Sequence, residues 1–189
     1  MAHFSAQPVR TVYEAAASTE PTPGGGVITA LSAMLGLALV LKAVRITRRH
    51  NEIAQFAAVE PELERLAHQF ELNADADAEG FARFIAAARL PHATQQEGET
   101  RRAGRDEAAA ASAEAAIATL RNARSAIRLT RKLRPKVHEV VAPDIAAGLR
   151  LLHVARRNAI DNAMGNLEAV SDPALKQRLL AELEQGERI

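Results

Sequence analysis

The chain has 189 residues, enough for one domain with a substantial hydrophobic core. Its 48% apolar and 25% charged residues are typical of a globular protein, while a formal net charge of +1 and 3% aromatic residues argue against a nucleic-acid-binding surface. The absence of cysteine excludes disulfides, thiolate metal sites and a cysteine nucleophile. We expect one domain over residues 1–189 and, because the first residues lack a signal-peptide pattern, a cytoplasmic location.

A short helix is predicted over residues 9–17, and a glycine-rich turn follows it, Pro21-Thr22-Pro23-Gly24-Gly25-Gly26. Beyond the turn, residues 27–41 contain no charged side chain. This apolar run is about 15 residues long, short of the ~20 that a bilayer needs, so we favour a buried central helix over 25–49 to a membrane span. One face of this helix has small residues that let a second helix approach closely: Thr29, Ser32 and Gly36.

Residues 51–89 have helical periodicity and predict one long helix, or two helices joined by a kink. Proline in a helix interior removes a backbone hydrogen bond, so we expect a break at Glu60, directly before Pro61. Later in the same segment, Asp77 lies one turn before Phe81 and faces the same way on a helix.

Capping signals predict three further helices. Thr94 and Glu97 form a capping box, which predicts a long alanine-rich helix starting there. Asp144 is the expected N-cap of a helix over 145–169, and Asp172 is the expected N-cap of a last helix. No stretch alternates apolar and polar residues with the period of a strand. The predicted fold is therefore an all-α, up-and-down bundle of about five to six helices, with the long small-residue helix buried at its centre.

The glycine turn is a candidate ligand site. Glycine lets the backbone come close to another group because no Cβ stands in the way. The first amides of the following helix have no partner inside it and lie at the positive end of the helix dipole. Gly24, Gly25 and Gly26 are thus suited to a carboxylate, a phosphate or an oxyanion. The alternative is that these glycines only allow a loop to pack closely.

Three acids and two amides are candidates for chemistry. Asp77, Asp144 and Asp161 lie in or beside apolar segments, where a carboxylate is a candidate general acid or base. The alternatives are a helix cap for Asp144 and a solvated charge for Asp77. Asn162 and Asn166, one helical turn apart, either orient a polar ligand or form hydrogen bonds between helices. The six histidines lack metal-ligand spacing, so we expect no metal site.

Four segments, in order and spacing, carry a resemblance to a known family. They are Thr22-Pro23-Gly24-Gly25-Gly26 with the small-residue helix after it, Asp77-Ala78-Glu79-Gly80-Phe81 with the later Leu90-Pro91, Val141-Ala142-Pro143-Asp144, and Asn162 and Asn166 followed by Leu167. Together they resemble the formiminotransferase-cyclodeaminase family, which includes single-domain methenyltetrahydrofolate cyclohydrolases. The resemblance covers about residues 22–180, and the glycine segment is its most specific part.

The resemblance implies an all-helical homodimer in folate-linked one-carbon metabolism. Its reaction is that of a cyclohydrolase, which converts methenyltetrahydrofolate to formyltetrahydrofolate, or that of a cyclodeaminase. Asp144 and Asp77 would handle protons, and the amides at residues 24–26 would bind a carboxylate or oxyanion. Asn162 and Asn166 would hold the pterin or the reacting nitrogen. The reduced folate or pterin is the substrate, and no separate cofactor, metal, nucleic acid or membrane partner is implied.

The sequence departs from the family pattern at the end of the central helix. Where the family usually has Asn-Leu-Thr-x-Gly-Lys, Arg45, Arg49 and His50 replace the amide, the glycine and the lysine. If that lysine is catalytic in relatives, His50 is the candidate to replace it, with a group that titrates near neutral pH. An alternative interpretation is a member that has lost catalysis or changed substrate, and that binds a reduced pterin or a protein partner.

Overall fold

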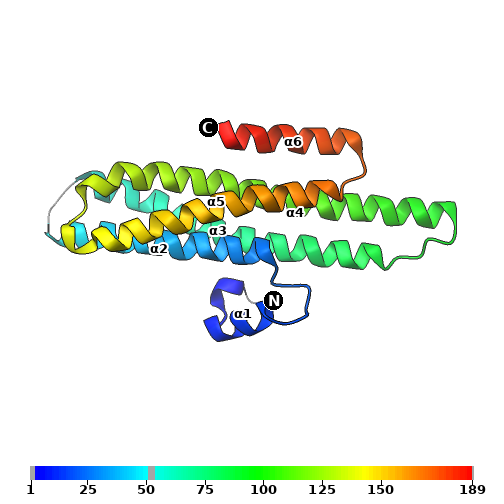
Figure 1. Ribbon diagram of the computed structural model, residues 1–189, viewed down its shortest axis with the longest axis horizontal. Coiled ribbons are helices and arrows are strands. Elements are labelled where there is room, and N and C mark those ends of the chain that lie inside the picture. The colour runs from blue at the N-terminus through cyan, green and yellow to red at the C-terminus, as the bar shows by residue number, and fades with distance from the viewer. Residues whose placement is uncertain (1–2, 51–53, 189) are drawn as a thin grey trace.

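The computed structural model describes residues 3–50 and 54–188, and within these ranges every regular element is helical (Figure 1). The α-helices are α1 (Val9–Ala16), α2 (Gly25–His50), α3 (Ala54–Ala88), α4 (Gln95–Leu133), α5 (Ala142–Glu168) and α6 (Pro173–Arg188). Single 3-10 turns are η1 (Phe4–Ala6), η2 (Arg134–Lys136) and η3 (Glu139–Val141). The predicted all-α fold is confirmed.

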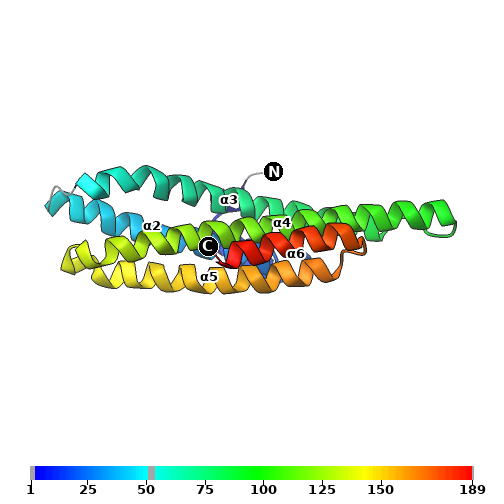
Figure 2. The same cartoon turned by 90° about the horizontal axis from the view of Figure 1, so that it is seen from above.

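Helices α2, α3, α4 and α5 form an up-and-down bundle. Each packs against the next along the chain, and α5 packs back against α2, so the four helices enclose a common core. α6 lies along α4 and α5 on the outside (Figure 2). α1 is set apart from the long helices in Figure 1, and its Val9 and Tyr13 are exposed.

α2 is the buried central helix that the sequence predicts. Part of its small-residue stripe faces α5: a Cβ added at Gly36 would lie 2.9 Å from Cβ of Leu151, and one added at Gly148 would lie 2.4 Å from the carbonyl oxygen of Gly36. Glycine therefore allows these two backbones to touch. By length and composition α2 is able to cross a membrane, with a mean hydropathy of 2.2 over an 18-residue window. In the bundle, 61% of that window is buried against other helices.

α3 contradicts the expected break at Glu60, because the helix continues without interruption past Pro61. Pro61 lacks the N–H that would bind the carbonyl of Ala57, four residues earlier. Both residues are exposed, so water can satisfy that carbonyl and the helix is preserved. Glu60 pairs with Arg45 of α2 (Oε1–Nε 2.7 Å) and with Arg48, which ties the two helices together at this end.

Two of the predicted helix caps are confirmed. The hydroxyl of Thr94 accepts a hydrogen bond from the amide of Glu97 (3.2 Å), and the carboxylate of Glu97 accepts one from the amide of Thr94 (3.0 Å). Asp172 accepts a hydrogen bond from the amide of Ala174 (2.9 Å) in the first turn of α6. Both caps satisfy amides that a helix start leaves without an internal partner.

The predicted cap at Asp144 is wrong. α5 begins at Ala142, and Val141 is its N-cap residue. Pro143 favours this earlier start, because its fixed φ suits the first helical turn. Asp144 lies inside that turn and pairs with Lys42 of α2 (Oδ2–Nζ 2.8 Å).

Candidate functional site

Four parts of the chain meet around a cavity of about 180 Å³, which we call the glycine-turn cavity. The glycine turn closes one side, and α3, α4 and α5 supply the other walls. Its lining residues are Pro21, Thr22, Gly24, Gly25, Gly26, Asp77, Phe81, Ser112, Asn162 and Asn166. Segments far apart in the sequence therefore bring both asparagines and one of the candidate acids to the glycine turn.

Asp77 is the titratable group of this cavity. Its Oδ1 accepts a hydrogen bond from Nδ2 of Asn162 (3.1 Å), and the carboxylate also accepts one from the backbone N–H of Val27. Burial raises the pKa of the Asp77 carboxyl, because the charged form loses water, while these two hydrogen bonds oppose the rise. A partly desolvated carboxylate facing a cavity is suited to taking up and releasing a proton.

The start of α2 does bind a carboxylate, but it is the protein's own. The amide of Val27, in the first turn of α2, donates to Asp77. A Cβ added at Gly26 would lie 2.1 Å from Oδ1 of Asp77, closer than atoms can approach, so the contact requires glycine at this position. At Gly25 an added Cβ would meet no atom within 4 Å. The three glycines therefore differ in role, and Gly26 is the one that admits the acid.

Two polar groups on the cavity walls have no hydrogen-bond partner among the described residues. They are the hydroxyl of Ser112 and Nδ2 of Asn166, both buried. Ser112 packs directly against the backbone of α3, since a Cβ added at Gly80 would lie 2.4 Å from its Oγ. Buried polar groups are nearly always satisfied in native proteins, so unpaired groups that line a cavity point to a polar ligand.

Sequence reasoning did not select Ser112 or Phe81 as site residues. Ser112 is the one hydroxyl residue in the alanine-rich run from Ala108 to Ala116, and this isolated polar side chain could have marked it as a candidate site residue. Phe81 was expected to face the same way as Asp77, and the structure confirms that both line the cavity. Phe81 is 36% exposed, which fits an aromatic residue at the mouth of a site.

The other predicted acids and His50 are not brought to this cavity within one chain. Asp144 is held by Lys42, roughly 25 Å beyond Gly25 along α2 at about 1.5 Å per residue. His50 ends α2 and stacks on His138, with ring centroids 4.3 Å apart. Within one chain, therefore, Asp144 and His50 lie apart from Asp77. Asp161 lies on the surface, where its side chain is 69% exposed.

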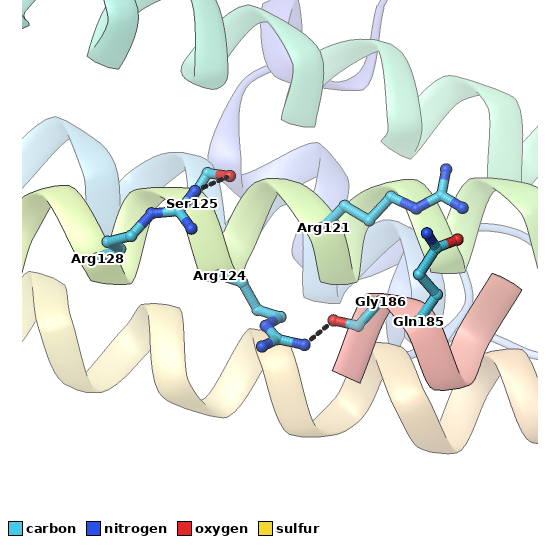
Figure 3. A pocket seen from close by; sticks show the side chains of 6 residues that line it. All are labelled: Arg121, Arg124, Ser125, Arg128, Gln185 and Gly186. Atoms are coloured by element: carbon cyan, nitrogen blue, oxygen red, sulfur yellow. Dashed lines mark hydrogen bonds between the residues drawn. The ribbon is translucent and has the colours of Figure 1, made fainter. Parts of the chain in front are cut away.

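A larger cavity, of about 410 Å³, lies between α4 and the C-terminal end of α6 (Figure 3). Arginine side chains from α4 line it, and each has a contact within the chain. Arg121 pairs with Glu182 (3.2 Å), Arg124 donates to the carbonyl of Gly186, and Arg128 lies 3.5 Å from the hydroxyl of Ser125. The contacts of Arg121 and Arg124 hold α6 against α4, and none of the three involves the residues of the glycine-turn cavity.

Comparisons with known proteins agree with this architecture. The model of the formiminotransferase-cyclodeaminase family matches residues 8–185. The chain is 28% identical over 184 residues to a methenyltetrahydrofolate cyclohydrolase of Methylorubrum extorquens, covering 93% of this chain and 86% of the relative. Its fold is similar to the crystal structure of formiminotetrahydrofolate cyclodeaminase from Thermotoga maritima, with a TM-score of 0.77, 22% identity, and coverage of 97% of this chain and 89% of the other.

Proposed function

We propose, because the chain belongs to the formiminotransferase-cyclodeaminase family, that it is an enzyme of folate-linked one-carbon metabolism that hydrolyses methenyltetrahydrofolate to formyltetrahydrofolate. The observation that carries the proposal is that one cavity is lined both by a partly desolvated carboxylate, Asp77, and by polar groups of Ser112 and Asn166 that have no hydrogen-bond partner among the described residues. The name of the cyclohydrolase relative supports the choice of reaction.

In this reaction the methenyl carbon, which joins two nitrogens in a cationic ring, is attacked by water. Asp77 takes one proton from the water as the new C–O bond forms, and a tetrahedral intermediate results. The bond from carbon to one nitrogen then breaks, and the proton held by Asp77 passes to that nitrogen. The remaining hydroxyl proton leaves to solvent as the formyl C=O forms. One water is consumed, and one proton is released in exchange for the cationic charge of the ring.

The neighbouring polar groups have separate tasks in this proposal. Asn162 positions Asp77 through its 3.1 Å hydrogen bond. The hydroxyl of Ser112 and the amide of Asn166 are the unused donors, and they are placed to steady the polar intermediate or to hold the pterin. The substrate is the reduced folate itself, and the proposed steps draw on side chains of this chain.

The direct test is the loss of methenyltetrahydrofolate absorbance, measured with the purified protein against the spontaneous rate in the same buffer. We expect clear acceleration with saturation in substrate. If the protein binds the folate tightly but leaves the rate unchanged, it is instead a non-catalytic member of the family, and the hydrolysis proposal fails.

A cyclodeaminase reaction is the second candidate, supported by the name of the Thermotoga structure. There a formimino group cyclises and ammonia leaves, so the acid must donate a proton rather than accept one. A carboxyl whose pKa is raised by burial, as for Asp77, suits that role also. Release of ammonia from formiminotetrahydrofolate, compared with methenyl hydrolysis by the same preparation, distinguishes the two reactions.

The Asn162→Leu variant tests the role of Asp77 through pH. If Asp77 is the general base, activity falls as the pH is lowered and its carboxylate becomes protonated. Asn162 opposes the burial effect on the pKa of Asp77, so removing its amide should raise that pKa further. The acid limb of kcat/KM should then move to higher pH.

Asn166→Leu is the matched control, because Asn166 makes no hydrogen bond to Asp77 in the structure. It should lower the rate with the limb unmoved. A limb that moves to lower pH in Asn162→Leu would contradict the assignment.

We also propose that the protein is a cytoplasmic homodimer. The bundle leaves apolar side chains exposed on adjacent helices, with Ile28 and Leu35 of α2 at 37% and 56% and Val154 of α5 at 53%. Burying such side chains against a second copy would remove them from water. Light scattering at micromolar concentration should give twice the chain mass, and Leu35→Glu should give a folded monomer. A wild-type monomer at that concentration would refute the dimer.

A further inference from the structure

A third cavity, of about 350 Å³, lies where the α3–α4 hairpin meets the loop between α5 and α6, and we call it the distal cavity. Its lining residues are His92, Gly98, Arg101, Arg102, Arg105, Asp106, Ala169 and Ser171. The reaction proposed above uses none of these residues. The distal cavity nevertheless lies along α4, the helix that also supplies Ser112 to the glycine-turn cavity.

The distal cavity has an excess of positive charge. Its acid, Asp106, is already engaged by Ser171, whose amide and hydroxyl both donate to it at 2.6 Å. Nε of Arg101 donates to the carbonyl of Ala88 (3.1 Å), which fixes its guanidinium at the cavity wall. The lining therefore has three arginines and one acid, and that acid already accepts two hydrogen bonds from Ser171. An anionic ligand would balance the excess positive charge.

Arg105, which lines this cavity, also has a buried donor without a partner. Its guanidinium lies over the ring of Phe84, 5.1 Å from the centroid, which orients the side chain. Nε of Arg105 is buried and has no hydrogen-bond partner among the described residues. A buried charged donor without an acceptor is costly, and a carboxylate is the acceptor that matches a guanidinium in shape and charge.

Residues of the two cavities lie along the same faces of α3 and α4. On α4, Arg105 precedes Ser112 by two turns and lies on the same side, roughly 10 Å away along the axis. On α3, the rings of Phe81 and Phe84 stack with centroids 6.5 Å apart. Phe81 lines the glycine-turn cavity, and the guanidinium of Arg105 lies over the ring of Phe84. The stacked pair therefore links a residue that lines the glycine-turn cavity to the arginine that lines the distal cavity.

We propose that the distal cavity binds the glutamate carboxylate of the folate substrate, with Arg105 as a specificity-determining residue. The pterin ring would lie at the glycine-turn cavity, and the flat aminobenzoyl spacer would lie along Phe81 and Phe84. This inference rests on the proposed function, because it requires a substrate whose ring and carboxylate are separated by an aromatic spacer.

The test compares two ligands, methenyltetrahydrofolate and methenyltetrahydropteroate, which lacks the glutamate. We expect the wild type to bind the glutamate-bearing ligand about 10- to 100-fold more tightly, as for a hydrogen-bonded charge pair. Arg105→Gln should bring the two affinities within about twofold, by weakening only the folate. Arg157→Gln, at an exposed arginine of α5, is the control and should keep the wild-type preference.

The outcomes separate this inference from the function on which it rests. Equal binding of the two ligands by the wild type, with turnover of either, overturns the carboxylate site and leaves the cyclohydrolase proposal in place. A wild type that binds neither ligand overturns both. Full preference retained in a folded Arg105→Gln protein, with its melting temperature measured in parallel, removes Arg105 from the site.

Discussion

Replacing Asp77 with asparagine is expected to lower kcat for methenyltetrahydrofolate hydrolysis by about 10²- to 10⁴-fold, the usual contribution of a general acid or base. The amide has the shape of the carboxylate, and its oxygen can still accept from Asn162 and from the amide of Val27. It cannot take a proton from water at neutral pH. Binding of the folate should therefore change much less than turnover, and a binding titration beside the kinetic assay measures both.

The same variant should be at least as stable as the wild type. Burial raises the pKa of Asp77, so folding disfavours its charged form, and this cost is present in full once the pH exceeds the folded-state pKa. Asparagine removes the charge and hence the cost, so the melting temperature at neutral pH should be equal or higher. Asp75→Asn is the control on the same helix, because Asp75 accepts from the amide of Phe4 outside the cavity. Wild-type kcat in Asp77→Asn would exclude Asp77 as the base.

Local signals in the sequence were sufficient for most of the fold. The apolar run after the glycine turn, the capping box at Thr94 and the cap at Asp172 each depend on residues within a few positions, and all three helices begin where these signals indicate. The errors came from competing local preferences. Pro61 lies at an exposed position, where water can satisfy the carbonyl that loses its helical hydrogen bond. Pro143 lies in the first turn of α5, which begins before Asp144.

The candidate site was only partly predictable, because it depends on how the helices align. Asp77 and Asn162 are 85 residues apart and meet through a single hydrogen bond between α3 and α5. Periodicity marks the inward side of each helix, but it does not fix which level of one helix faces which level of another. Asp144 therefore looked equivalent to Asp77, although it lies at the level of Lys42. Arg105 gave no signal, since its significance comes from Phe84 beneath it and its unpaired Nε.

Gly26→Ala should be nearly as damaging to activity as the loss of the acid, although it adds one methyl group. None of the described residues has a positive φ, so alanine fits the backbone at this position. The new Cβ would lie 2.1 Å from Oδ1 and 2.4 Å from Oδ2 of Asp77. The carboxylate must turn away, and it then loses the amide of Val27 and the hydrogen bond from Asn162. Misplacing a catalytic group by about 1 Å can cost 10²-fold in rate, and we expect a loss of that order in kcat.

Two comparisons distinguish this steric mechanism from general destabilisation. Gly165→Ala makes the same change on α5, where the added methyl meets no atom within 4 Å, and it should keep wild-type kcat with an unchanged or slightly higher melting temperature. The double variant Gly26→Ala/Asp77→Asn should be no slower than Asp77→Asn alone, because both changes remove the same proton acceptor. Independent, additive losses would mean that Gly26 acts on something other than Asp77, such as direct approach of the substrate to the backbone. Wild-type activity in Gly26→Ala would show that the carboxylate does not need its place at the start of α2.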